Sequence, residues 1–120
     1  MASSNTGGSD FPKPGIFSTI HSGAPIITSE KLLGASNYKS WAASVKLWFR
    51  GQGYLDHLTK QESDVAETER PNWIKIDAQL CSLLWNSIDS HLLSTYQAYE
   101  TCYDVWNRAA TVYSNDIQFR

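Results

Sequence analysis

Residues that could do acid–base, metal or nucleophilic chemistry are few and scattered in this chain of 120 residues. The three histidines lack the i, i+4 pairing and the cysteine neighbours typical of a metal site. No G-x-S-x-G nucleophile elbow and no glycine-rich phosphate loop is present. We therefore predict that the chain is not an enzyme and that it holds no cofactor, no metal and no small-molecule substrate. Each histidine is expected on the surface or at a helix cap: His21, His57 and His91.

The two cysteines, Cys81 and Cys102, fall on expected helices without C-x-x-C spacing. This pattern favours buried free thiols and a reducing compartment. The opening segment MASSNTGGSD has no apolar core, and no apolar run approaches the roughly 18 residues that span a membrane. We expect a soluble intracellular protein without a membrane partner, cytoplasmic, with the nucleus left open.

Basic and aromatic side chains are the remaining source of chemistry, because together they can grip and stack single-stranded nucleic acid. Lys39, Lys46 and Arg50 share one stripe of an expected helix, at i, i+7 and i+11. The net charge of −2, however, lacks the basic excess of a domain devoted to nucleic-acid phosphates. The tryptophans that fall at core-facing helical positions are Trp41, Trp73, Trp85 and Trp106, and Trp48 lies nearer the edge of its face.

Helices must position these residues, since apolar residues recur at helical spacing and β-branched residues never alternate for long. The segment from Pro71 to Ile88 has two apolar stripes and one polar stripe, which predicts a central helix surrounded by other elements. The first apolar stripe comprises Trp73, Ile76, Leu80, Leu83 and Leu84, the second comprises Ile74, Cys81, Trp85 and Ile88, and the polar stripe comprises Lys75, Gln79, Ser82 and Asn86.

A first helix is expected from a side-chain cap at Ser36 or Asn37 to about Arg50. Gly51 and Gly53 then supply the backbone freedom that stops it. Its apolar face comprises Tyr38, Trp41, Ala42, Val45, Trp48 and Phe49, and its opposite side carries the candidate interaction surface, Lys39, Lys46, Leu47 and Arg50.

Shorter segments complete the helical pattern. A turn with helical spacing follows Gly53, a short helix follows a cap at Asp89 or Ser90, and Thr101 with Asp104 resembles a capping box that opens another helix. Asn115 with Gln118 resembles one more helix start. The residues at helical spacing are Tyr54, Leu55 and Leu58 in the turn, Leu92, Leu93 and Tyr96 in the short helix, and Val105, Trp106, Ala109, Val112 and Tyr113 in the last.

These segments predict an all-α fold, a compact bundle of about four to five helices with a flexible N-terminal arm. The arm covers residues 1–25, which are rich in Ser, Gly and Pro, and the helical domain covers residues 26–120. A helix start at Asn115 would leave that domain truncated at its C-terminal end. Basic residues predominate from Lys31 to Lys60 and acidic residues from Gln61 to Arg70, so the surface charge is expected to be bipolar.

Several motifs occur in an order that has a counterpart in a known family. They are the segment KLLGASNYKSW (31–41), Trp73, Leu84-x-x-Ser87-Ile88, and Thr101-x-x-Asp104-Val105-Trp106 followed by Tyr113. Over about residues 26–120 the chain resembles the Gag-like N-terminal domain of plant Copia-type retrotransposons. The residues that carry the resemblance most clearly are Leu33, Gly34, Asn37, Tyr38, Trp41, Trp73 and Trp106.

This resemblance implies a helical capsid-type domain that self-associates, in particles that enclose the RNA of the element. Its implied partners are copies of itself or other Gag-like chains, held by individually weak contacts. The C-x2-C-x4-H-x4-C zinc knuckle of many Gag proteins is missing here, as are protease, integrase and reverse transcriptase motifs. An RNA-binding module that uses the basic stripe is the alternative. An active element, a decayed copy and a host gene all remain open as origins.

Overall fold

The structure, a computed structural model, describes residues 25–118, with side chains up to residue 114. In that range it contains five α-helices, two 3₁₀ turns and no strand, which confirms the predicted all-α fold of four to five helices. The predicted flexible arm lies outside the described residues apart from Pro25. The elements are η1 (Ala35–Asn37), α2 (Tyr38–Gln52), α3 (Asp56–Thr59), η2 (Glu62–Asp64), α4 (Arg70–Asn86), α5 (Ser90–Tyr96) and α6 (Cys102–Gln118).

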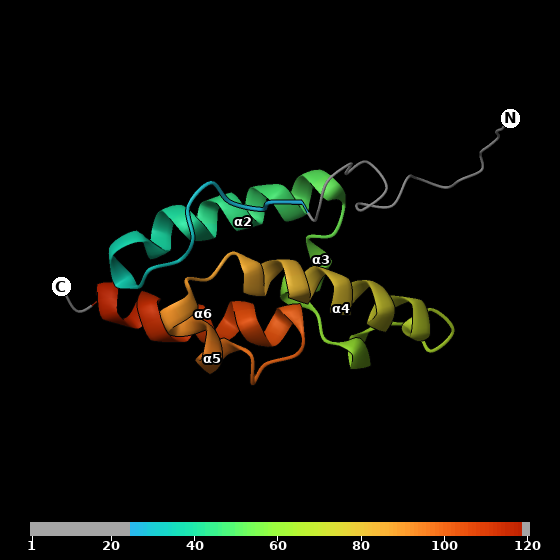
Figure 1. Ribbon diagram of the computed structural model, residues 1–120. Coiled ribbons are helices and arrows are strands. Elements are labelled where there is room, and N and C mark those ends of the chain that lie inside the picture. The colour runs from blue at the N-terminus through green and yellow to red at the C-terminus, as the bar shows by residue number, and fades with distance from the viewer. Residues whose placement is uncertain (1–24, 119–120) are drawn as a thin grey trace, which may run out of the picture.

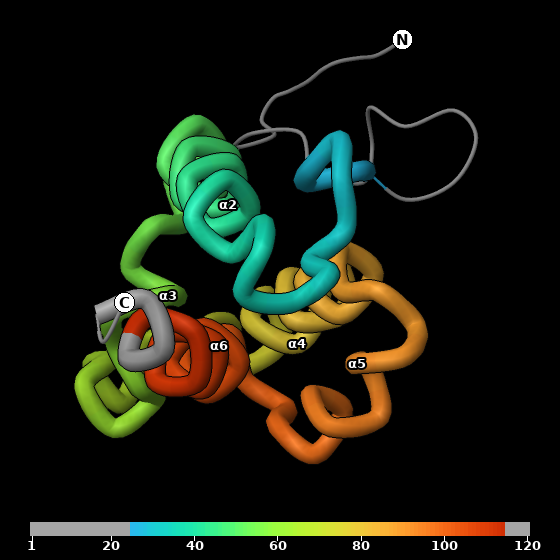
Figure 2. The backbone as a smooth tube through the Cα atoms, turned by 90° about the vertical axis from the view of Figure 1, so that its left-hand side faces the viewer, coloured from blue at the N-terminus to red at the C-terminus, as the bar shows by residue number. Residues whose placement is uncertain are grey.

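The three long helices α2, α4 and α6 pack lengthwise against one another (Figure 1). α2 runs opposite to α4 and α6, which share one direction, so α5 and the turns beside it must carry the chain back between them. Viewed end-on, the three helices stand at the corners of a triangle, with α3 beside α6 (Figure 2). The apolar faces meet in its middle, where each buried large side chain contributes about 1.5–3 kcal/mol.

The predicted central helix is confirmed as α4, and both of its apolar stripes contribute buried residues, among them Leu80, Cys81 and Leu84. The whole predicted polar stripe is exposed. Ile74 was expected to pack, yet 45% of it is exposed, because it lines an open pocket beside the start of α6. Asp77, which belongs to no predicted stripe, is buried. One acidic side chain therefore lies inside the bundle.

The predicted first helix is confirmed as α2, with its expected apolar face turned to the core. Its predicted ends are partly wrong. Neither Ser36 nor Asn37 makes a side-chain cap, because the turn η1 leads directly into the helix. Gly51 lies within the helix, and only Gly53, with φ 81°, takes the left-handed conformation that stops it.

An extended strap, defined as residues 25–34, precedes α2 and crosses the C-terminal end of α4. The Leu32 N–H donates to the carbonyl of Ser87 at 2.8 Å, and the Leu32 carbonyl accepts from the N–H of Asp89 at 3.0 Å. These bonds form an isolated parallel bridge between Leu32 and Ile88. Leu32 is fully buried, so the strap covers the end of the core that helices alone would leave open.

The two later helices are confirmed as α5 and α6. Asp89 caps α5 by accepting from the N–H of His91, and Thr101 caps α6 by accepting from the N–H of Asp104. The helix start predicted at Asn115 is wrong, because α6 continues without interruption to Gln118. An Asn-x-x-Gln pair signals a cap only where the preceding backbone leaves the helical conformation. The truncation expected at the C-terminal end of the domain stays a prediction.

Candidate functional site

The residues of the KLLGASNYKSW segment form the junction between the strap and α2. The Asn37 side chain donates to the carbonyl of Lys31 and accepts from the N–H of Leu33, both at 2.9 Å. Gly34 has φ 146°, a conformation that L-residues rarely adopt. These two residues fold the strap back onto the start of α2, so their role in the structure is to build the fold. Leu33 itself is 49% exposed.

Aromatic residues of the resemblance join this junction to the other long helices. The Trp41 indole N–H donates to the carbonyl oxygen of Ser87 at 3.0 Å, which ties α2 to the end of α4. The ring of Trp41 lies 6.0 Å from that of Trp106 on α6, and Tyr38 lies 5.7 Å from Tyr113. Such ring pairs contribute roughly 0.5–1.5 kcal/mol each beyond their burial. The predicted core placement is correct for Trp41, while Trp106 is half-buried and packs on the core.

Trp73 lies apart from this cluster and stacks on His57, with ring centroids 3.6 Å apart and an interplanar angle of 12°. His57 is only 4% exposed, so its predicted surface or cap position is wrong. Its Nδ1 lies 2.8 Å from a carboxylate oxygen of Asp77 on α4. Because a carboxylate accepts, Nδ1 carries the hydrogen and donates. The histidine is thereby fixed between an indole face and a buried acid.

The second carboxylate oxygen of Asp77 accepts from the N–H of Cys102 at 3.2 Å. Cys102 is the first residue of α6, so an acid on α4 satisfies a free donor at the N-terminus of another helix. Sequence reasoning missed this network of His57, Asp77 and Cys102. The available signal was an acid at position 77 on the apolar side of a predicted helix, four residues after Trp73 and three before Leu80.

The two thiols border the same network and are free and buried, as predicted. The Cys102 thiol donates to the backbone carbonyl of Asp77 at 3.5 Å, and the Cys81 thiol to that of Tyr99 at 3.7 Å. Burial, with further contributions from Cys81 and Asp77, raises the pKa of Cys102 far above its usual range. A thiol held in its neutral form is a poor nucleophile. The arrangement therefore favours a structural role for Cys102.

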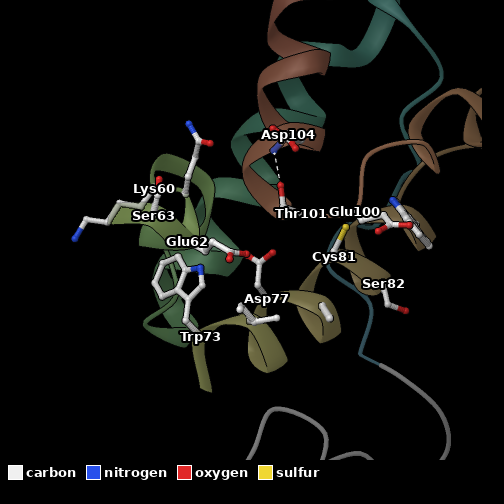
Figure 3. A pocket seen from close by; sticks show the side chains of 14 residues that line it. Lys60, Glu62, Ser63, Trp73, Asp77, Cys81, Ser82, Glu100, Thr101 and Asp104 are labelled. Atoms are coloured by element: carbon white, nitrogen blue, oxygen red, sulfur yellow. Dashed lines mark hydrogen bonds between the residues drawn. The ribbon is translucent and has the colours of Figure 1, made fainter. Parts of the chain in front are cut away.

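A pocket of about 640 Å³ opens beside this network, between η2, α4 and the start of α6 (Figure 3). Trp73, Ile74, Ala78 and Trp85 give it apolar walls from α4, and Glu62 and Asp77 point into the same space. No sequence pattern predicted it, because its walls come from segments far apart in the chain. Its remaining lining residues are Lys60, Gln61, Ser63, Cys81, Ser82, Glu100, Thr101 and Asp104.

The candidate interaction surface, Lys39, Lys46, Leu47 and Arg50, lies on the side of α2 that faces away from the core. All four residues are exposed, and 60% of Leu47 is accessible to solvent. None of the three cations is in an ion pair with another described residue. The four side chains form one exposed face of α2 that is basic and partly apolar. None of them lines the pocket.

Within residues 25–118 no group of three or more His, Cys, Asp and Glu side chains is arranged to hold a metal ion. In the same residues no helix is both long and apolar enough to cross a lipid bilayer. Comparison with protein-family models, with curated proteins and with solved structures found no match. The site must accordingly be interpreted from its own geometry.

Proposed function

We propose that the chain is a non-enzymatic, Gag-like protein-interaction domain of retrotransposon origin that associates weakly with copies of itself. The observation that carries the proposal is the structural role of the motif residues, which hold the helices together. Gly34, Asn37, Tyr38, Trp41 and Trp106 connect the strap, α2, α4 and α6 into one helical body. Motif residues that stabilise the fold and include no reactive group are typical of a domain that acts through contacts on its surface.

The exposed side of α2 supports the same proposal. Lys39, Lys46, Leu47 and Arg50 leave an apolar side chain and three cations without partners among the described residues. Contacts that bury well under about 1,200 Å² are typically transient. A face of four exposed residues on one helix is of this small kind. Many such weak contacts, repeated between identical chains, can build an assembly that a single contact would not hold.

Sedimentation measured over a range of protein and salt concentrations tests self-association. We expect monomer to dominate at micromolar concentration and oligomers to appear as concentration rises. Association should weaken as salt increases, because exposed charges are screened over about 8–10 Å at physiological salt. A chain that stays monomeric at every concentration would refute the proposal. A tight dimer insensitive to salt would refute the weak, charge-dependent contact.

Binding of single-stranded RNA by the basic stripe is the second candidate function. It is favoured by Lys39, Lys46 and Arg50, which share an exposed stripe of α2, a helix that contains no acidic residue. Three phosphate contacts on single-stranded RNA would give a slope of roughly −2 when the logarithm of affinity is plotted against that of salt concentration. Measured affinity for an RNA oligonucleotide with this slope would favour this candidate, and no measurable affinity would exclude it.

A further inference from the structure

The pocket between η2, α4 and α6 combines an apolar surface on α4, called here its floor, with exposed acids, called its rim. The Asp77 carboxylate also points into this space, and its two oxygens already accept from His57 and Cys102. Trp73, Trp85 and the exposed part of Ile74 supply apolar surface. The rim carries the exposed acids Glu62, Glu100 and Asp104, none of which is in an ion pair with a described residue. The one cation of the rim, Lys60, lies 3.6 Å from the Asp56 carboxylate, so its charge is already partly compensated. The pocket therefore favours a ligand that is apolar at its tip and positive at its edge.

The candidate interaction surface on α2 has that composition. Leu47 projects from the helix, and its neighbours at i−7, i−4 and i−3 are the small residues Ser40, Ala43 and Ser44. Lys46 and Arg50 lie along one side of it. A single apolar side chain with cations on one side of it, carried on a helix, can insert into an apolar pocket while its charges orient the contact.

From this complementarity we infer that the pocket of one copy of the chain receives the α2 face of a second copy. Leu47 enters the apolar floor, and Lys46 and Arg50 face the rim acids Glu62 and Glu100. The inference rests on the proposed self-association and specifies its two surfaces. A pocket of about 640 Å³ is within the roughly 300–1,000 Å³ range of sites that enclose small ligands, so it has room for one anchoring side chain with its flanks.

The contact pairs two different surfaces, and no pocket-lining residue comes from α2. One chain can therefore offer its α2 face to one neighbour and its pocket to another. Head-to-tail contacts of this kind close into rings or continue as open chains, whereas contacts between identical surfaces stop at a dimer. The geometry thus allows assembly beyond two copies from a single type of weak contact.

Charge-reversed variants of the full chain test the contact by sedimentation. One variant carries Lys46→Glu with Arg50→Glu on α2, and the other carries Glu62→Lys with Glu100→Lys on the pocket rim. All four positions are exposed, so both variants should keep the circular dichroism spectrum and melting temperature of the wild type. The matched control, Glu30→Lys with Glu67→Lys, makes the same change of charge at exposed positions outside the pocket.

We expect each variant alone to lose the concentration-dependent association of the wild type, because like charges then meet at the contact. An equal mixture of the two should associate again, since every α2 face now meets a pocket of opposite charge. The control should associate as the wild type does. A pocket variant that associates normally, or a mixture that stays monomeric, would overturn the inference while self-association itself stands.

Two further outcomes separate the remaining possibilities. A wild-type chain that is monomeric at all concentrations would remove the proposed function and this inference together. If the α2 variant loses affinity for an RNA oligonucleotide while its self-association is unchanged, the α2 face binds RNA, and the inferred contact is wrong.

Discussion

Asp77 is the residue on which the packing of α3, α4 and α6 depends most directly. Its two carboxylate oxygens accept from Nδ1 of His57 and from the backbone N–H of Cys102. Both donor residues are buried, at 4% and 0% exposure. Removing the carboxylate leaves both buried donors without their acceptor, and an unpaired buried donor carries a desolvation cost.

Asp77→Ala should lower the free energy of unfolding by about 1–3 kcal/mol for each of the two buried donors it leaves unpaired. Denaturant unfolding followed by circular dichroism measures the loss. Asp104→Ala is the control, because this exposed acid in the first turn of α6 should contribute under about 1 kcal/mol. Equal losses for the two variants would show that the buried network does not stabilise the bundle.

Asp89 makes the stability of the native state depend on pH in the acidic range. Hydrogen bonds from the His91 side chain and backbone lower the pKa of this carboxyl below its ordinary value of 3.8. A carboxyl whose pKa is depressed by folding stabilises the native state above its unfolded pKa, and this contribution is lost as pH falls through the folded pKa. Asn also caps helices well, so Asp89→Asn removes mainly the charge.

The wild type should therefore be more stable than Asp89→Asn above pH 3.8, and the difference should vanish as the pH falls below that value. Thermal unfolding of both proteins across this range is the measurement. A difference in melting temperature that stays constant as the pH falls would contradict the assigned role of Asp89.

At the scale of elements, a single residue sets the C-terminal end of α2. Gly53 stops the helix through a left-handed conformation, φ 81°, and its N–H bonds to the carbonyl of Arg50 at 3.1 Å. Gly51, two residues earlier, is helical, and a Cβ added there would meet nothing within 4 Å. The two glycines are close in sequence, but Gly51 continues the helix and Gly53 ends it.

We expect Gly51→Ala to raise the free energy of unfolding by about 0.5–1 kcal/mol, because alanine loses less backbone entropy in a helix. Gly53→Ala should lower it by about 1–2 kcal/mol, the cost of a left-handed conformation with a Cβ. The denaturant midpoints of the two variants, each compared with that of the wild type, measure these changes. Shifts of the same sign would mean that the helix end lies elsewhere.

Apolar spacing was sufficient to predict α2, α4, α5 and α6, because each of these helices buries apolar residues that recur at helical spacing along its own length. It could not predict the network of His57 and Asp77, whose partners are 20 residues apart and meet only when α3 packs on α4. The pocket and the bridge between Leu32 and Ile88 were missed for the same reason. A periodic pattern records which side of a helix is buried, and it contains no information about which helices meet.

At the scale of the whole molecule, residues that build the body and residues that can contact a partner are separate. Trp41, Leu80 and Leu84 lie in the core, whereas Lys46, Leu47 and Arg50 lie on the outer side of α2. Changes on the outer side should therefore alter association without altering stability. Of the acids on the pocket rim, only Glu62 belongs to the acidic segment Gln61–Arg70 noted in the sequence, and Glu100 and Asp104 come from later in the chain.

The most direct test of self-association through α2 is the sedimentation of Leu47→Asp beside the wild type over a range of concentrations. Leu47 is 60% exposed, so its replacement should change the free energy of unfolding by no more than about 0.5 kcal/mol. Ile26→Asp, at a strap residue 81% exposed, controls for the added charge. We predict that Leu47→Asp stays monomeric at concentrations where the wild type and Ile26→Asp associate. A folded Leu47→Asp that associates as the wild type does would contradict the assignment of this face.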